Sequence, residues 1–235
     1  MTSSSDITIS SRISPWLGRL VYPLGSYALL PLYFGRIDIS GQENIPRCGP
    51  TILAPTHRSR WDAIIVPHAT GRLVSGRYLR FMVSADEMCG LQGWFIRRLG
   101  GFPVNPQSPG LESLRHTVEL LCQGEMLTIF PEGNIFRQPT VSPLKRGVAV
   151  AALQAQAKLK QQTVKIVPIS LHYSDEYPRW GSNARVDIGE PIDAIDYYHG
   201  SLKRDSKHLT ADLELALKAL HEVERQNNQA LASVA

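Results

Sequence analysis

Short runs of apolar residues recur along this chain between segments with helical spacing, and this alternation limits the possible folds more than any other feature. The runs at residues 50–55, 126–130 and 164–172 are almost continuously apolar, which is typical of strands buried on both faces of a sheet. Between them, residues 111–123 carry leucine and valine at helical spacing, and residues 147–160 are rich in alanine. The pattern predicts an α/β fold with a largely parallel or mixed central sheet covered by helices.

The remaining segments extend this pattern over most of the chain. Further strands are expected before a turn at Gly41 and at residues 79–84, 102–104 and 185–188, and further helices at residues 61–69, 90–98 and 211–226. No internal repeat or flexible linker divides the chain, and 235 residues with 43% hydrophobic content can bury a core without disulfides or a metal. We therefore expect a polar tail at residues 1–12, a separate segment at residues 13–34 and a single domain at residues 35–235.

The segment at residues 13–34 is apolar, with Arg19 as its only charge. A membrane span needs about 20 apolar residues in continuous helix, but Pro15, Pro23 and Pro31 recur here and should break the segment into short helices. Short apolar helices with one tryptophan and three tyrosines suit the membrane interface, so we expect an interfacial helical segment. Packing on the protein's own core and a true span are the two alternatives.

Charge is distributed unevenly along the chain. Residues 1–117 contain 12 arginines, no lysine and 7 acidic residues, whereas residues 118–235 contain 13 basic and 14 acidic residues. Guanidinium groups present paired donors that suit phosphates and carboxylates. The first half therefore predicts an anionic partner, such as a phosphate-bearing substrate, a lipid headgroup or an acidic carrier protein, with a solvated surface as the alternative. No dense basic patch with interleaved aromatics is present, which argues against nucleic-acid binding.

The cysteines indicate the compartment. Cys48, Cys89 and Cys122 form no CxxC pair, so neither a zinc site nor a disulfide framework is indicated, and we expect no metal. Free thiols fit a reducing compartment, and the N-terminus lacks the basic region of a secretory signal. Together with the interfacial segment, this predicts a membrane-associated protein at the cytoplasmic face.

A histidine and an aspartate follow directly on the first apolar run. His57 and Asp62 lie five positions apart, which on one regular helix would separate them by about 140°. They can meet only if His57 lies in the loop and Asp62 in the first helical turn, reaching back. A histidine held in this way can act as a general base, with the carboxylate fixing its tautomer. The spacing alone is common by chance, so the pair needs supporting motifs.

Further motifs occur in order along the chain. They are a glycine-rich segment with Gly93, Arg97 or Arg98, Gly101 and Val104; Phe130-Pro131-Glu132-Gly133 after a strand; Lys145-x-Gly147 before a helix; and Val167-Pro168 in a strand. With His57-x4-Asp62, this set resembles the glycerolipid acyltransferases, in particular the bacterial 1-acylglycerol-3-phosphate acyltransferases. The resemblance covers roughly residues 35–190.

The resemblance implies transfer of an acyl chain from a thioester to the free hydroxyl of a lysophospholipid, with 1-acylglycerol 3-phosphate giving phosphatidic acid. His57 would take the hydroxyl proton, Asp62 would orient His57, and backbone amides near the motif would hold the oxyanion. No acyl-enzyme is expected, because the chain has no GxSxG and no cysteine beside His57; Ser59 is the alternative nucleophile. The donor would be acyl-CoA or acyl-carrier protein as co-substrate, with no bound cofactor.

The resemblance also implies an acceptor site. Glu132 and Gly133 would shape it, with a strand-end capping carboxylate as the alternative role of Glu132. Cations for the acceptor's phosphate would come from Arg58, Arg97, Arg98, Arg137 and Lys145.

The chain departs from the family pattern at several phosphate-binding positions. Asn134-Ile135 stands where Thr-Arg is usual, Asn105 and Pro106 replace the arginine after Val104, and a lysine usual near residues 84–87 is missing. A different lysolipid or hydroxyl acceptor therefore remains open. So do a lipid-binding protein of the same fold without turnover, and a hydrolase or transacylase that uses no thioester.

Overall fold

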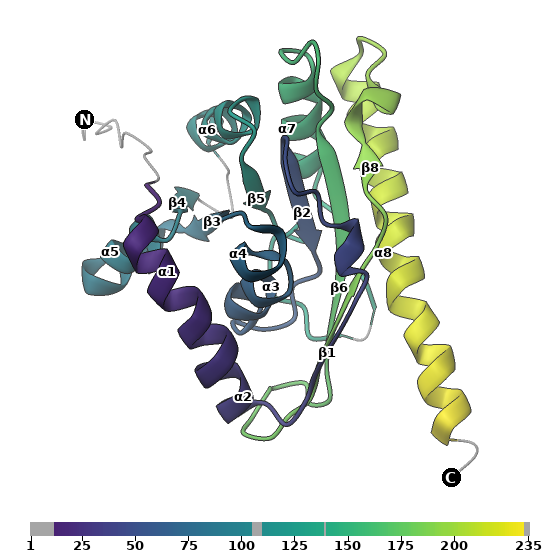
Figure 1. The fold of residues 1–235 in the computed structure, drawn as a ribbon. Coiled ribbons are helices and arrows are strands. Elements are labelled where there is room, and N and C mark those ends of the chain that lie inside the picture. The colour runs from purple at the N-terminus through teal and green to yellow at the C-terminus, as the bar shows by residue number, and fades with distance from the viewer. Residues whose placement is uncertain (1–11, 105–109, 139, 233–235) are drawn as a thin grey trace, which may run out of the picture.

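The computed structural model describes residues 12–104, 110–138 and 140–232, with side chains up to residue 221 (Figure 1). Within this part, eight strands form one sheet in the order β1-β7-β6-β2-β5-β3-β4, and β8 also pairs with β6. The strands are β1 (Ile37–Ser40), β2 (Thr51–Pro55), β3 (Leu79–Ser84), β4 (Gly101–Val104), β5 (Met126–Thr128), β6 (Lys165–Tyr173), β7 (Ala184–Ile188) and β8 (Ile192–Asp193). The polar tail expected at residues 1–12 lies almost entirely outside the described residues.

The sheet is mixed, as the sequence predicts. Strands β2 to β6 all run parallel, with Leu53 of β2 level with Thr128 of β5 and Val167 of β6. Strands β7 and β8 run antiparallel to β6, and β1 is parallel to β7. The five parallel strands therefore share one carboxyl edge, where the chain leaves each of them.

Helices cover both faces of the sheet. They are α1 (Pro15–Leu24), a π-helical turn (Gly25–Leu29), α2 (Leu30–Tyr33), α3 (Asp62–Thr70), α4 (Arg72–Ser75), α5 (Gly90–Arg98), α6 (Leu111–Cys122), α7 (Gly147–Gln156) and α8 (Leu202–Ala232). Three short 3-10 turns lie at Gln42–Asn44, Ala85–Met88 and Ala194–Tyr197. One core cluster unites α2 and α3 with the sheet, and the other unites α6, α7 and α8 with it. The connections from β2 to β3 and from β3 to β4 cross the sheet in the same direction. Because connections between parallel strands are right-handed, α3 in the first and α5 in the second lie on the same face of the sheet.

The N-terminal segment is not broken at its prolines, contrary to the sequence expectation. Helix α1 runs through Pro23 and continues by way of the π-helical turn into α2, which carries Pro31 in its first turn. In the π-helical turn, the Leu30 N–H donates to the Gly25 carbonyl five residues earlier. This wider turn changes the hydrogen-bond register just before Pro31, whose missing N–H would otherwise interrupt a regular helix.

The N-terminal helix presents two different faces. One face packs on the domain through buried Leu17, Tyr22 and Leu30, so packing on the core is correct for this face. The opposite face exposes large apolar side chains, namely Trp16, Leu20, Leu24, Tyr27 and Leu32. None of the helices in the described ranges has the length and apolar character needed to cross a membrane.

Two other helices differ in length from their predicted ranges. Helix α7 ends at Gln156 rather than 160, because the Gln156 side chain accepts the Val164 N–H at 2.9 Å and thereby ties the chain into a turn. Helix α8 begins at Leu202 rather than 211. There the Asp205 carboxylate accepts the N–H groups of His199 and Ser201 at 3.0 Å each, which satisfies donors at the helix start.

Candidate active site

The residues of the predicted site come together at the carboxyl edge of the parallel strands. His57 follows β2 by two residues, Glu132 follows β5 by four, and Tyr173 is the last residue of β6. Strands β5 and β6 flank β2 on either side. Parallel strands that lie next to one another release their chains at the same edge, which explains why these residues, far apart in sequence, meet.

His57 and Asp62 form a hydrogen-bonded pair with the predicted geometry. His57 lies in the loop and Asp62 is the first residue of α3, and His57 Nδ1 lies 2.8 Å from Asp62 Oδ2. Because an ionised carboxylate only accepts, Nδ1 carries the hydrogen and Nε2 has the lone pair of a base. The His57 ring stacks on Phe130, with centroids 3.9 Å apart, and its side chain is 20% exposed. The ring is therefore fixed in orientation and accessible from solvent.

Asp62 is completely buried and accepts four hydrogen bonds. Besides His57, its Oδ2 accepts the N–H groups of Arg58 and Ser59 at 2.7 and 2.9 Å. Its Oδ1 accepts the Tyr173 hydroxyl at 2.5 Å. Burial, and then the negative charge of Asp62, raise the pKa of Tyr173 far above its usual value, so this hydroxyl keeps its proton and donates it. The carboxylate is thus held from several directions.

Arg58 and Glu132 form a buried ion pair behind His57. Arg58 Nη1 lies 2.8 Å from Glu132 Oε2, and the two side chains are 6% and 0% exposed. Glu132 also accepts the N–H groups of His57 at 2.7 Å and Ser142 at 2.9 Å, while Arg58 donates to the Phe136 carbonyl at 2.9 Å. The pair therefore ties the loop after β2 to the loop after β5.

These contacts bear on three sequence expectations. Arg58 and Glu132 are buried and engaged with each other and with backbone groups, so they shape the site by holding its loops in place. The backbone amides of His57, Arg58 and Ser59 donate to the carboxylates of Glu132 and Asp62, so they cannot also hold an oxyanion. Glu132 holds two loops together. This role extends the alternative expected for Glu132, in which the carboxylate at the end of a strand caps the next turn.

Gly133 and Lys145 lie against each other. Gly133 has φ +74°, and a Cβ at this position would come within 2.6 Å of Lys145 Nζ. The Lys145 N–H also donates to the Pro131 carbonyl at 2.8 Å. Glycine at position 133 therefore serves a positive φ and leaves room for the lysine side chain, a backbone role that differs from direct substrate contact.

Arg137 lies close to His57 and is exposed. The preceding residue, Phe136, donates its N–H to the His57 carbonyl at 2.8 Å. The Arg137 guanidinium lies 4.4 Å from the ring centroid of Tyr177, in the loop between β6 and β7. A guanidinium that lies over an aromatic face keeps its N–H donors, which point outward in its own plane, available to other groups. Besides the buried Arg58, Arg137 and Lys145 are thus the predicted cations that the structure places in the loops around His57, and both are exposed.

Arg97 and Arg98 are not brought to this site, which corrects another expectation. Both are exposed at the end of α5, four and three residues before β4 begins. Since β4 is parallel to β2, its start lies at the opposite edge of the sheet from His57. There the Arg98 carbonyl accepts the Ser14 N–H at 2.8 Å.

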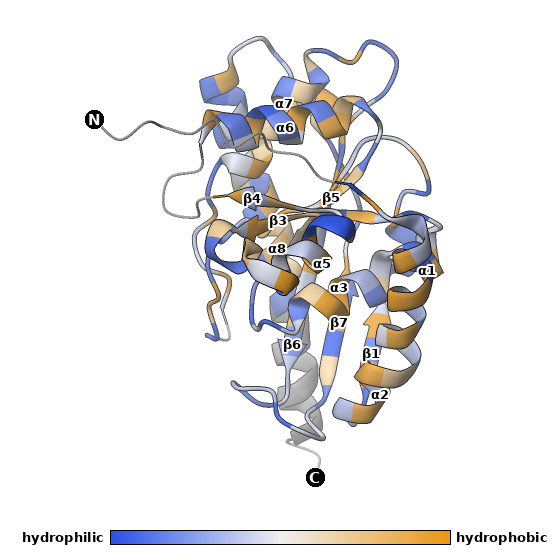
Figure 2. Cartoon of the chain, turned by 90° about the vertical axis from the view of Figure 1, so that its left-hand side faces the viewer, coloured by the Kyte–Doolittle hydropathy of each residue, from blue (hydrophilic) through white to orange (hydrophobic). Residues whose placement is uncertain are grey.

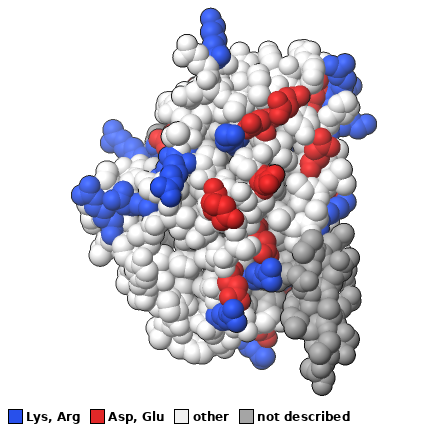
Figure 3. Space-filling model, turned by 45° about the vertical axis from the view of Figure 1, so that its right-hand side comes forward, with Lys and Arg blue, Asp and Glu red and all other residues white. Residues whose placement is uncertain are grey.

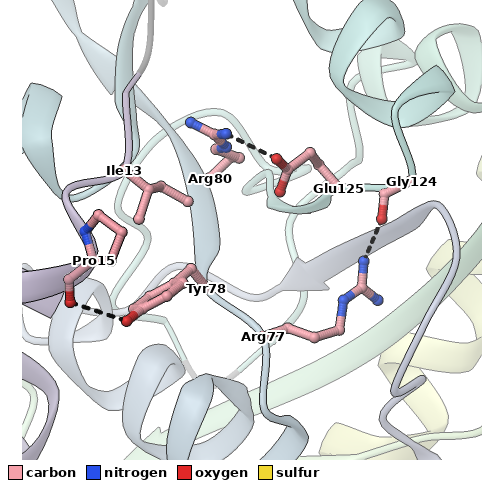
Figure 4. A pocket seen from close by; sticks show the side chains of 7 residues that line it. All are labelled: Ile13, Pro15, Arg77, Tyr78, Arg80, Gly124 and Glu125. Carbon is pink, nitrogen blue, oxygen red and sulfur yellow. Dashed lines mark hydrogen bonds and ion pairs between the residues drawn. The ribbon is translucent and has the colours of Figure 1, made fainter. Parts of the chain in front are cut away.

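An open pocket of about 360 Å³ also lies at that opposite edge (Figure 4). Its lining residues are Ile13, Pro15, Arg77, Tyr78, Arg80, Gly124 and Glu125. Arg77 donates to the carbonyls of Gly49 and Gly124 at 2.8 and 2.6 Å, and Arg80 pairs with Glu125 at 2.8 Å. The arginines therefore hold loops together, and the pocket is separate from the His57–Asp62 pair.

Comparison with known proteins identifies the family. The family profile described as Acyltransferase matches residues 36–172, more than half of the chain. The chain belongs to the acyltransferase family. This acyltransferase is 26% identical over 189 residues to the 1-acyl-sn-glycerol-3-phosphate acyltransferase of Bacillus subtilis, covering 79% of this chain and 88% of that protein. It is 28% identical over 151 residues to the Streptococcus pneumoniae protein of the same name, covering 62% of this chain but 51% of that protein.

A solved structure confirms the fold of this acyltransferase. The 1-acyl-sn-glycerophosphate acyltransferase PlsC of Thermotoga maritima matches with a TM-score of 0.66 at 20% identity, over 88% of this chain and 79% of that one. The α/β fold with a mixed sheet predicted from the sequence is therefore correct.

Sequence reasoning missed Tyr173, which lies one residue beyond the range of the family match. A signal for it was present. In the strand expected at residues 164–172, alternate residues face the same side of the sheet, and Tyr173 continues the alternation of Val167, Ile169 and Leu171. The pairing of Pro55 with Ile169 shows that Tyr173 extends past the end of β2, level with the loop that carries His57.

Proposed function

We propose that this enzyme transfers a fatty acyl chain from an acyl thioester to the free hydroxyl of a lysophospholipid, with 1-acylglycerol 3-phosphate as acceptor and phosphatidic acid as product. The observation that carries the proposal is the His57–Asp62 hydrogen bond of 2.8 Å at the carboxyl edge of the sheet, inside the region of the family match. The names of the Bacillus and Streptococcus relatives support the choice of acceptor.

The chemistry follows from the state of the two ring nitrogens. His57 Nε2 takes the proton of the acceptor hydroxyl as its oxygen attacks the thioester carbonyl carbon. The tetrahedral intermediate collapses, the carbon–sulfur bond breaks, and the imidazolium returns its proton to the leaving thiolate. Asp62 holds Nδ1–H throughout and stabilises the imidazolium between the two steps. No acyl-enzyme forms, and Ser59 is unsuited as a nucleophile because it is buried.

The acceptor's phosphate is proposed to bind Arg137 and Lys145. Both lie on the loop between β5 and α7, and their exposure leaves them accessible to a bound lipid. The donor is acyl-CoA or acyl-carrier protein, and no resident cofactor takes part. The exposed apolar face of the N-terminal helix is proposed to rest on the cytoplasmic face of a membrane, where the acceptor is found.

The proposal is tested with purified protein in mixed micelles. Palmitoyl and oleoyl thioesters of coenzyme A and of carrier protein are each offered with lysophosphatidate, other lysophospholipids and glycerol 3-phosphate. We expect transfer to lysophosphatidate. Transfer only to another acceptor would refute the choice of acceptor, release of free fatty acid would indicate a hydrolase, and no reaction from folded protein would indicate a lipid-binding protein.

Replacement of Arg137 by alanine is expected to raise KM for lysophosphatidate about tenfold, with a smaller effect on kcat. The guanidinium would bind the phosphate in ground and transition states alike, and losing such an interaction changes KM more than kcat. Steady-state kinetics with varied acceptor measure both constants. Arg179→Ala, an exposed arginine of the β6–β7 loop paired with Asp175, is the matched control. An unchanged KM in Arg137→Ala would remove this residue from the acceptor site.

Replacement of Tyr173 by phenylalanine is expected to lower kcat about tenfold while KM for both substrates stays near the parent value. The change removes the hydroxyl that donates to Asp62 Oδ1 and keeps the ring that stacks on Phe34. With one hydrogen bond fewer, the carboxylate orients His57 less firmly. Both kcat and KM are measured, and kcat is calculated per folded enzyme. Urea denaturation gives the folded fraction, because a loss of folded enzyme would also lower the apparent kcat at an unchanged KM.

A further inference from the structure

Helix α5 exposes an apolar face that the packing of the domain does not use. Leu91, Trp94 and Phe95 are 73%, 41% and 39% exposed, and with Arg98 they occupy positions i, i+3, i+4 and i+7, which form one face of a helix. On the opposite face Gly93 is buried, and a Cβ there would clash with the Met88 backbone in the turn before the helix. Three large apolar side chains on a helix of 9 residues are more than scattered surface residues would give.

The C-terminal end of α5 adjoins the beginning of α1. The Ser14 N–H, just before α1, donates to the Arg98 carbonyl at the end of α5, and Ile13 forms a bridge with Leu99. Figure 1 shows α5 beside the beginning of α1, and Figure 2 shows both helices on the same side of the molecule, with hydrophobic residues along α1. Both helices also lie on the α3 face of the sheet.

The other end of α5 lies beside the turn that carries the His57–Asp62 pair. Arg60, within that turn, pairs with Glu87 at 2.9 Å, and Glu87 accepts the side chain of Gln92 in the first turn of α5. The N-terminal helix ends next to the same turn, because the rings of Tyr33 and Trp61 are in contact, with centroids 4.1 Å apart. The two helices are thus neighbours where α1 begins and α5 ends, and the other end of each lies beside the turn at the edge of the active site.

The charge of α5 indicates the chemistry of its partner. Arg97 and Arg98 are exposed, Arg98 lies 4.5 Å above the Trp94 ring, and the helix contains no acidic residue. The acidic Asp86 and Glu87 precede the helix, at the end away from these arginines. By contrast, Figure 3 shows acidic and basic side chains intermixed on the side of the molecule that carries α8. Tryptophan beside arginine, next to exposed leucine and phenylalanine, matches the interfacial region of a bilayer with anionic headgroups.

We propose that α5 and α1 together form one lipid-binding surface, in which α5 inserts Leu91, Trp94 and Phe95 at headgroup depth while Arg97 and Arg98 bind lipid phosphates. The proposal deepens the proposed function, on which it rests for the lipid substrate. It assigns the two arginines to an anionic bilayer and gives the enzyme a second lipid-binding helix beside the N-terminal one. A lipid acceptor would then pass from the bilayer to His57 along the surface between them.

The test is co-sedimentation of the full chain with vesicles in the absence of substrates, at low and high salt. Vesicles of phosphatidylglycerol and phosphatidylcholine in equal parts are compared with phosphatidylcholine alone. The variants are Arg97→Glu with Arg98→Glu, and separately Trp94→Ser. Matched controls on α6, on the other face of the sheet, are Arg115→Glu and Leu111→Ser, whose side chains are also exposed. Circular dichroism and urea denaturation check the fold of each variant.

We expect the double arginine variant to bind anionic vesicles about tenfold more weakly or worse, with a small change on neutral vesicles. Trp94→Ser should weaken binding to both kinds of vesicle several-fold, and the α6 controls should bind like the parent. Parent-like binding by the α5 variants would overturn the proposal. The proposal would also be overturned if the α5 variants bound vesicles like the parent and lost acyl transfer from acyl-carrier protein while keeping transfer from acyl-CoA. That result would make the α5 face a protein-docking surface. If the parent shows no acyl transfer but α5 still governs vesicle binding, the proposed function fails and the lipid surface stands.

Discussion

Replacement of His57 by alanine is expected to lower the acyl-transfer rate by a factor of about 10²–10⁴, the range attributable to a general base. The side chain lies in a loop and is 20% exposed, and its main packing contact is the stack on Phe130. Losing that stack costs about 1 kcal/mol of stability, which leaves the domain folded. The rate at saturating substrate and the free energy of unfolding are measured on the same preparation.

The matched control is His208→Ala, an exposed histidine on α8. Its acyl-transfer rate and its unfolding curve should equal those of the parent. A parent-like rate in His57→Ala would show that another group takes the proton. A low rate accompanied by a large loss of stability would assign the effect to folding and would contradict the view of His57 as a loop-borne base.

Replacement of Glu132 by alanine is expected to destabilise the protein by about 3–5 kcal/mol, the usual cost of breaking a buried ion pair from one side. The change leaves the Arg58 guanidinium buried without its carboxylate, and the N–H groups of His57 and Ser142 without their acceptor. Urea denaturation followed by circular dichroism measures the loss. Because Glu132 holds the backbone of His57, the remaining folded enzyme should also show a reduced kcat.

Two companion variants sharpen this experiment. Glu112→Ala breaks the exposed pair with Arg115 and should change stability by less than about 1 kcal/mol. Replacing Arg58 and Glu132 together by methionine and leucine should recover part of the loss, because no unpaired charge then remains buried. A Glu132→Ala protein of parent-like stability with a raised acceptor KM would instead support the substrate-contacting role inferred from the sequence resemblance.

Several features of this acyltransferase follow from the sequence because they depend on neighbours along the chain. The five-residue spacing from His57 to Asp62, after an apolar strand and before a helix, permits one arrangement in which the side chains meet, and the structure has that arrangement. The strands expected at residues 50–55, 126–130 and 164–172 appear as β2, β5 and β6, because continuous apolar runs of this length can be buried on both faces.

Other features depend on which strand ends are neighbours, and only the tertiary structure decides that. Arg58 and Glu132 lie 74 positions apart, and they become a brace because β5 pairs with β2. Tyr173 reaches Asp62 over 111 positions because β6 flanks β2 on its other side. Arg97 and Arg98 belong to one of the motifs on which the sequence resemblance rests, yet they precede β4 and so emerge at the opposite edge of the sheet.

The physical reason is that local sequence fixes the backbone conformation of a segment, whereas the environment of a charged side chain is set by strand order and direction. Hydrophobic periodicity identified most strands and helices of this chain, although not the continuous N-terminal helix or the ends of α7 and α8. Tertiary packing decided which group each carboxylate at the end of a strand or helix contacts: a substrate, a guanidinium or a backbone amide. The reason is that a buried charge needs a partner, and the fold determines which partners lie nearby.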